Sequence, residues 1–154
     1  MIKKITTYLL LLVPVTVGVA QSSCDMHTLG DACKKELKPF LYSTQNAMHV
    51  QLKSEAQQKD IVVNTFGGEK YRIIINTASM PKGTHVDIYD QDASHKKRKQ
   101  FFSTEDLGVS SFDTENKSGK LFVEYSIPAA SADVSAGCAV IMIGYENKYT
   151  MGDK

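Results

Sequence analysis

The chain has 154 residues, of which 42% are hydrophobic and 23% are charged, and its formal net charge at pH 7 is +1. This length is typical of one globular domain, and the hydrophobic share is large enough to build a core, which excludes an intrinsically disordered chain. The near balance of charge excludes a global attraction to nucleic acid or to an anionic membrane, so any such attraction has to come from a local patch.

The first 20 residues have the layout of a secretory signal peptide. Two lysines precede an apolar stretch from Tyr8 to Val19, and the small residues Gly18 and Ala20 lead to a cleavage site before Gln21. The apolar stretch is shorter than the roughly 20 residues that a membrane helix needs. The sequence therefore predicts an exported protein, periplasmic or extracellular, and removal of 20 of the 154 residues leaves a mature chain of 134.

Residues 21–45 are expected to form a short N-terminal helical segment. The stretch LGDACKKELKPF, residues 29–40, indicates about two helical turns, with Asp31 as the N-cap and Pro39 as the stop. The predicted organisation is a signal peptide (1–20), this segment, a β-sandwich domain (46–146) and a polar tail (147–154) that is expected to fray.

From residue 46 to residue 146 the sequence indicates short strands separated by turns. Apolar and polar side chains alternate in AMHVQLK, KYRIIIN, THVDIYD and KLFVEYSIP, as they do in half-buried strands. About eight strands at a spacing of roughly 10 residues predict an all-β fold, an antiparallel β-sandwich of jelly-roll type. The side chains expected to point into the core are Met48, Val50, Leu52, Tyr71, Ile73, Ile75, Val86, Ile88, Leu121, Val123, Tyr125 and Ile127.

The last predicted strand lies in AGCAVIMIGYE, residues 136–146, and is apolar on both faces. Such a strand is expected at the centre of a sheet with a cover on each side, and the helical segment could supply one cover. In an exported chain two of three cysteines should form a disulfide, and we predict Cys33 with Cys138 in preference to the local pair Cys24 with Cys33. A spare Cys24 leaves a lipid anchor open, although residues 21–23 lack the aliphatic residue typical of a lipoprotein signal.

The segments GGEKYRIII, VDIYD, LFVEYSIP and GCAVIMIGYE, in this order, resemble those of a group of small exported proteins of unknown function from Bacteroidetes-type bacteria. The chain is more loosely similar to the bacterial pre-peptidase C-terminal domain, in which a glycine turn leads into a Y-x-I strand and the next strand ends in an aromatic residue and Asp. The resemblance covers about residues 33–146. It implies a jelly-roll-like sandwich that is accessory to another protein and not a catalyst, and it brings no functional residues to carry over.

The segment YDQDASHKKRKQFF, residues 89–102, holds the best candidate for a binding site. Four consecutive cations, Lys96, Lys97, Arg98 and Lys99, precede Phe101, which suits phosphate, sulfate or uronate groups with a sugar or base stacked on the ring. On a strand these cations would alternate between faces, so half of them would address one surface. The alternative, which we favour for the run as a whole, is a solvated edge whose lysines prevent pairing with another sheet.

Asp90 and Asp92 in the same segment are candidate calcium ligands, because turn carboxylates spaced by two residues can share one ion. The alternative is an ordinary polar turn, and no other cofactor is indicated. His49 and His85 fall on outward positions of predicted strands and could meet on one sheet face to bind a transition metal. No H-x-H or H-E-x-x-H motif supports that pair, so ordinary surface histidines are the preferred interpretation.

No G-x-S-x-G elbow and no phosphate-binding glycine loop occur, so the sequence does not predict an enzyme. Tyr89, Phe102 and Phe122 are, together with Phe101, candidates for an exposed aromatic docking patch. The alternative, which the sequence leaves open, is that a second layer, such as the N-terminal helix and loops, covers these rings.

We therefore expect a non-catalytic, exported binding or accessory module of the cell envelope or periplasm. Its partner would be another envelope protein, or an anionic glycan or lipid head group, whereas nucleic acid and a membrane span of the mature chain are not expected. The alternatives are a calcium-stabilised structural subunit of an envelope assembly and, less favoured, a secreted hydrolase.

Overall fold

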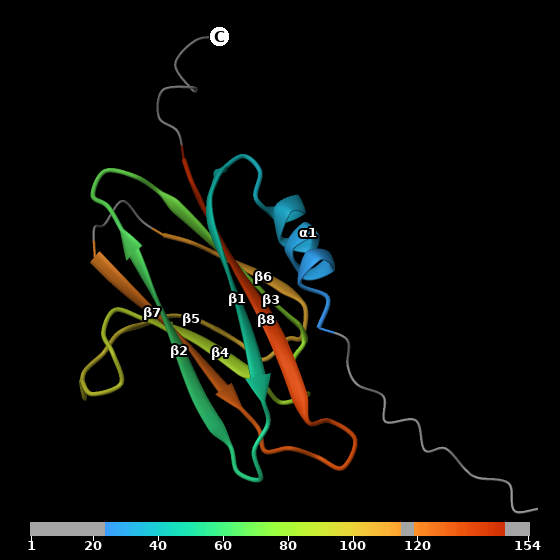
Figure 1. Cartoon of the computed structure of the whole chain (residues 1–154). Coiled ribbons are helices and arrows are strands. Elements are labelled where there is room, and N and C mark those ends of the chain that lie inside the picture. The colour runs from blue at the N-terminus through green and yellow to red at the C-terminus, as the bar shows by residue number, and fades with distance from the viewer. Residues whose placement is uncertain (1–23, 115–118, 147–154) are drawn as a thin grey trace, which may run out of the picture.

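The computed structural model describes residues 24–114 and 119–146, in which two four-stranded antiparallel sheets pack face to face (Figure 1). The predicted signal peptide and the predicted tail lie outside the described residues. In chain order the elements are α1 (Met26–Glu36), β1 (Leu41–Gln51), β2 (Gln57–Thr65), β3 (Tyr71–Ser79), β4 (His85–Tyr89), β5 (Gln100–Thr104), β6 (Val109–Asp113), β7 (Gly119–Ile127) and β8 (Ala136–Tyr145).

The strand order is β1-β8-β3-β6 in the first sheet, called sheet A here, and β2-β7-β4-β5 in the second, called sheet B. Successive strands lie in opposite sheets, except that β4 and β5 pair as a hairpin. The prediction of an all-β sandwich is confirmed. Its jelly-roll subtype stays a prediction, which the alternation of successive strands between the two sheets supports.

The main core lies between the two sheets and is built from side chains that alternate along the strands. Ile73 and Ile75 of β3 and Val86 and Ile88 of β4 are at most 1% exposed. The same cluster contains eleven of the twelve predicted inward side chains, and Met48 packs against it while partly buried. The period-two pattern was therefore sufficient to identify the inner faces of β1, β3, β4 and β7.

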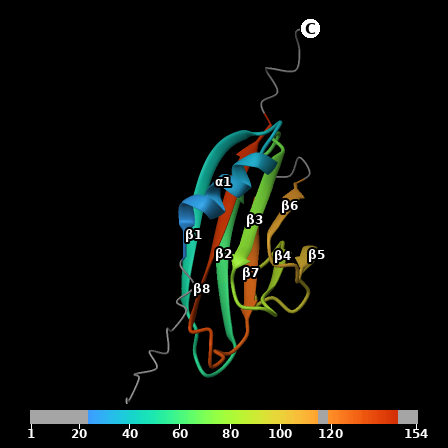
Figure 2. The same ribbon diagram turned by 90° about the vertical axis from the view of Figure 1, so that its right-hand side faces the viewer.

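The outer face of sheet A is covered by α1, as Figure 2 shows with the helix in front of the sheet. A second cluster joins one face of the helix to the outward side chains of the two central strands of this sheet: Leu29, Cys33, Leu37, Phe40, Ile74, Cys138, Val140 and Met142. Strand β8 lies between β1 and β3 and is buried on both faces. The prediction of a doubly covered last strand is confirmed.

The helix begins earlier than predicted. Asp25, not Asp31, is the N-cap, because its carboxylate accepts hydrogen bonds from the backbone N–H groups of His27 (3.0 Å) and Thr28 (3.2 Å). Asp31 lies inside the helix and pairs with Lys34 at 2.8 Å. A Cβ at Gly30 would lie 3.1 Å from the side-chain amide of Gln45, so glycine leaves room for that side chain beside α1.

The predicted disulfide is wrong in one partner. Cys138 pairs with Cys24, and Cys33 is a free, fully buried thiol on the helix face that packs against sheet A. Burial raises the pKa of the Cys33 thiol to about 11. The disulfide also occupies the sulfur of Cys24, which overturns the lipid-anchor alternative for this residue.

The sandwich domain starts at Leu41, ahead of the predicted start at residue 46. The first residues of β1 form an edge strand with mostly exposed side chains, so no buried face produced an alternation that the sequence could reveal. Among the described residues, no helix has both the length and the apolar character that crossing a bilayer requires.

Candidate functional site

The outer face of sheet B is the exposed broad face of the sandwich, since α1 packs on β8, β3 and β6 of the other sheet. An apolar row crosses this face, in which Phe122 of β7 is paired in register with Val62 of β2 and with Tyr89 of β4. Phe122 is half-buried and Val62 is 43% exposed. The prediction that Phe122 and Tyr89 lie on an outward face agrees with these positions.

A row of carboxylates lies next to the apolar row. Glu124 of β7 is paired in register with Asp60 on one side and Asp87 on the other. Like charges directly opposite each other destabilise a sheet, and a buried carboxylate needs partners. Glu124 is 5% exposed; it forms an ion pair with Arg98 and accepts a hydrogen bond from Nε2 of Gln58 at 3.0 Å. The charge of Glu124 is thus neutralised, and both of its carboxylate oxygens have partners within the protein.

Arg98 reaches this acid from the loop that connects β4 and β5. Its guanidinium carbon lies 3.7 Å from the centroid of the Tyr89 ring, which is cation–π distance. The hydrogen bond to Glu124 raises the pKa of Arg98 above its ordinary value. Arg98 therefore fastens the loop to sheet B and is not part of a free basic patch.

The rest of the basic run is also placed differently from the prediction. Residues 91–99 form a loop and not a strand, so the expected alternation between two faces does not apply. Lys99 Nζ lies 5.1 Å from the centroid of Phe101, whose ring stacks against Phe112 at 6.3 Å. Within this run, Lys96 and Lys97 are exposed and have neither an ion pair nor a ring contact among the described residues.

Phe101 and Phe102 are consecutive, yet both pack against the main core. The register between β4 and β5 shifts after the pair Ile88 and Phe102, and Tyr89 is then opposite Gln100. This irregularity leaves Phe101 as an extra residue, which allows two neighbouring rings to point inward. The prediction that these two rings belong to an exposed aromatic patch is wrong.

Asp90 and Asp92 hold the backbone of the same loop. Asp90 accepts a hydrogen bond from the Lys99 N–H at 2.7 Å, and Asp92 accepts one from the Ser94 N–H at 2.9 Å. The hydroxyl and the N–H of Ser94 lower the pKa of Asp92 to about 2. In residues 24–114 and 119–146 no three His, Cys, Asp or Glu side chains are arranged so that they could hold one metal ion, and the hydrogen bonds of Asp90 and Asp92 favour the polar-turn alternative over a calcium site.

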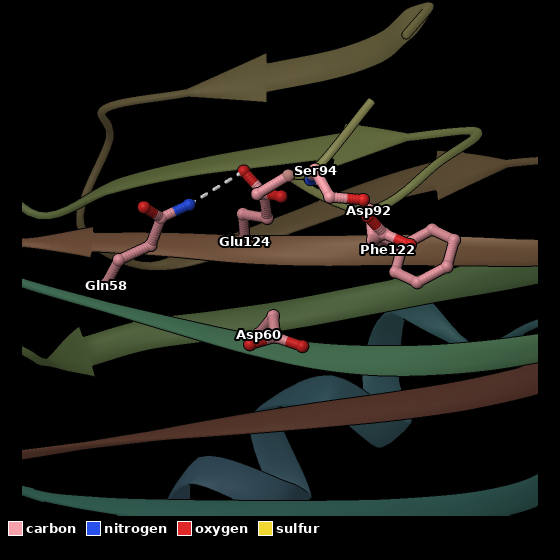
Figure 3. Close-up of a pocket in the computed structure, with 7 residues that line it drawn as sticks. Gln58, Asp60, Asp92, Ser94, Phe122 and Glu124 are labelled. Carbon is pink, nitrogen blue, oxygen red and sulfur yellow. Dashed lines mark hydrogen bonds between the residues drawn. The ribbon is translucent and has the colours of Figure 1, made fainter. Parts of the chain in front are cut away.

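A pocket of about 390 Å³ lies where this loop meets the outer face of sheet B (Figure 3). Figure 3 shows Gln58 and Glu124 joined by their hydrogen bond, with Asp60 on the neighbouring strand and Phe122 farther along β7. The lining residues are Gln58, Asp60, Asp92, Ala93, Ser94, Phe122 and Glu124. Except for Asp92 and Phe122, none of these was a sequence candidate, because strand register decides which outward side chains become neighbours.

His85 is the centre of a second polar network on the outer face of sheet B. Its Nε2 lies 3.0 Å from both Asp87 Oδ1 and Ser103 Oγ, and its Nδ1 lies 3.3 Å from Glu105 Oε1. Ser103, His85 and Glu105 thus have the spacing of a serine–histidine–acid triad. A general base, however, needs one ring nitrogen free of a carboxylate so that it can accept the hydroxyl proton, and both nitrogens of His85 face carboxylates.

His49 and His85 do not form the metal pair that was the less favoured alternative for them. His49 lies on β1 in sheet A and His85 on β4 in sheet B, so the two residues belong to different sheets. Both lie on strands, as predicted, but the sequence contains no signal for which sheet a strand joins.

No family model matches the chain, and a search of curated proteins finds no match.

Proposed function

We propose that the protein is an exported, non-catalytic binding module that holds its partner on the outer face of sheet B. The observation that carries this proposal is the pocket between the β4–β5 loop and strands β2 and β7. Its walls are held in place before any ligand arrives, because Arg98 joins the loop to Glu124 and Asp92 closes the loop on itself. Such pre-arranged polar groups lower the ordering cost of binding.

Export is supported by two independent features. The first 20 residues have the composition of a signal peptide, and Cys24 and Cys138 form a disulfide, a bond that persists in oxidising compartments. The partner is then another envelope protein, or a glycan or lipid head group of the envelope.

The charges of the loop and of the pocket act in opposite ways on an anionic partner. Lys96 and Lys97 at the exposed end of the loop suit an anionic glycan or lipid head group. Asp60 and Asp92 line the pocket below and would repel the same group there. An anionic partner would therefore contact the loop, with the pocket left for a different part of the ligand.

A non-catalytic role is supported by His85. Its two ring nitrogens are engaged by Asp87 and Glu105, and its contact with Ser103 lies on the sheet face and not among the pocket residues. The arrangement therefore supports a hydrogen-bond network that joins β4 to β5 and not a nucleophile with its base.

Carboxylate footprinting tests the proposal without knowledge of the partner. Asp60 and Asp133 are both exposed, but only Asp60 lines the pocket. Carbodiimide labelling of each residue is measured by mass spectrometry for the purified protein and for the protein mixed with the envelope fraction of its source. We expect labelling of Asp60 to fall several-fold while labelling of Asp133 is unchanged. Equal labelling of Asp60 in both samples would contradict a binding role for this face.

A further inference from the structure

Most side-chain groups that remain free in the pocket are acceptors. Asp60 is exposed, and neither of its carboxylate oxygens has a partner among the described residues. Gln58 donates one N–H of Nε2 to Glu124, which leaves its amide oxygen and its second N–H free. Asp92 accepts hydrogen bonds from Ser94 on one oxygen only. Because carboxylate and carbonyl oxygens accept and do not donate, a ligand that fits this pocket has to supply donors.

The ring of Phe122 adds an apolar platform to the same pocket. It projects outward from β7, is half-buried, and lies in register between Val62 and Tyr89. The face of an aromatic ring carries partial negative charge and attracts the weakly positive C–H groups of a flat ligand face. The pocket volume of about 390 Å³ falls within the range of small-molecule sites.

The charges around the pocket disfavour anionic and cationic ligands relative to neutral ones. An anionic group brings acceptors to acceptors and meets Asp60 and Asp92, so it is disfavoured. A cation would fit best against Glu124 and Tyr89, but Arg98 already occupies that position. What remains for a second cation is Asp60, which is exposed, and the free oxygen of Asp92, whose side chain is 49% exposed; ion pairs at such exposed carboxylates contribute little.

We propose that the pocket binds a neutral saccharide, one ring of which stacks on Phe122 while its hydroxyl groups donate hydrogen bonds to Asp60 and Gln58. A sugar ring has hydroxyl donors at its edge and C–H groups on its face. The acceptors of the pocket suit the hydroxyl groups, and the Phe122 ring suits the C–H groups. The inference rests on the proposed binding function and specifies its ligand class.

The test is a titration of the ¹⁵N-labelled mature protein followed by amide chemical shifts. The probes are neutral tetrasaccharides of β-1,4-glucose, α-1,4-glucose, β-1,4-xylose, β-1,4-mannose and N-acetylglucosamine, with Nα-acetyl-lysine amide as the cationic probe and a heparin tetrasaccharide as the anionic one. We expect saturable shifts from at least one neutral probe at the amides of Asp60 and Phe122. No saturable shift from any neutral probe overturns the proposal, and so does binding of the lysine probe at these amides in place of a saccharide.

Matched variants distinguish the contribution of the Phe122 ring from effects that any similar substitution would have on binding. Phe122→Leu should weaken saccharide binding about tenfold because the stacking face is lost. Asp60→Asn should weaken it several-fold, because the amide keeps only one of the two acceptors. Phe66→Leu, at a ring that is 70% exposed outside the pocket, and Asp133→Asn are the controls and should leave binding unchanged. Equal loss in Phe122→Leu and Phe66→Leu would overturn the proposal.

Failure of this inference differs from failure of the binding function. If Asp60 is protected from labelling by the envelope fraction while no saccharide binds, the face binds a partner and the ligand class is wrong. If Asp60 is not protected and no saccharide binds, both proposals are wrong.

Discussion

Replacement of Arg98 by alanine is the most direct test of how the site is held together. The change removes the ion pair with Glu124 and the stacking on Tyr89, and it leaves a carboxylate with only the amide of Gln58 as a partner. The Glu124 side chain is 6% exposed and that of Arg98 is 22% exposed, so the pair is neither fully buried nor at the surface.

The expected cost follows from these two exposures. Removing one partner of a buried pair costs about 3–5 kcal/mol, whereas an exposed pair is worth about 0–1 kcal/mol. Because Glu124 would stay buried while water could enter from the side of Arg98, we expect a loss of about 2–3 kcal/mol in the free energy of unfolding. For a domain of this size that corresponds to a fall in Tm of about 10 °C.

Urea denaturation of the variants measures this cost. Lys97→Ala in the same loop is the control and should stay within about 0.5 kcal/mol of the original protein, since Lys97 is exposed and has no ion pair among the described residues. In a double-mutant cycle, Glu124→Gln should recover much of the loss in the Arg98→Ala background, because a neutral amide does not need the cation. A cost below about 0.5 kcal/mol for Arg98→Ala, or a coupling energy near zero, would refute this account of the site.

Three further predictions follow from buried or capped groups. One thiol per chain, that of Cys33, should react with Ellman's reagent only after denaturation, because burial raises its pKa to about 11; a thiol that reacts in the folded protein, or the absence of one after unfolding, would contradict the Cys24–Cys138 pairing. The hydrogen bonds that Asp92 accepts from Ser94 should be fully formed above pH about 4 and be lost as pH falls through about 2, because the pKa of Asp92 is lowered from 3.8 to about 2 in the folded state; the amide shift of Ser94 should follow this range, and Asp92→Asn should abolish that dependence. Tyr125→Phe should be neutral or stabilising by about 1 kcal/mol in urea, because the buried Tyr125 hydroxyl has no partner among the described residues; a loss of more than about 1 kcal/mol would show that the hydroxyl is bonded.

The two errors of prediction in the N-terminal part of the chain have different causes. The N-cap is set locally, since Asp25 accepts hydrogen bonds from residues two and three positions away, and the prediction chose Asp31 in its place. The disulfide is set by long-range packing. The choice between Cys24 and Cys33 as the partner of Cys138 depends on how the helix lies on sheet A. No local pattern contains that information.

The candidate site was predicted in part. The loop of residues 91–99 was singled out by its charges, but two of the four cations of its basic run are engaged within the molecule: Arg98 pairs with Glu124, and Lys99 lies over Phe101. The pocket needs Asp60 from β2 beside Glu124 from β7, two residues that are far apart in the chain and meet only through strand register.

By itself, the sequence determined the class of fold and the inner faces of β1, β3, β4 and β7. Local sterics and the alternation of apolar side chains act over a few residues, so the strands, the turns and the doubly buried β8 can be predicted from the sequence. Only the tertiary structure decided which strands share a sheet, which cysteine reaches Cys138, and which outward side chains surround the pocket. Those outcomes depend on packing between segments distant in the chain, where the free energy of the whole core selects one arrangement among many with the same local pattern.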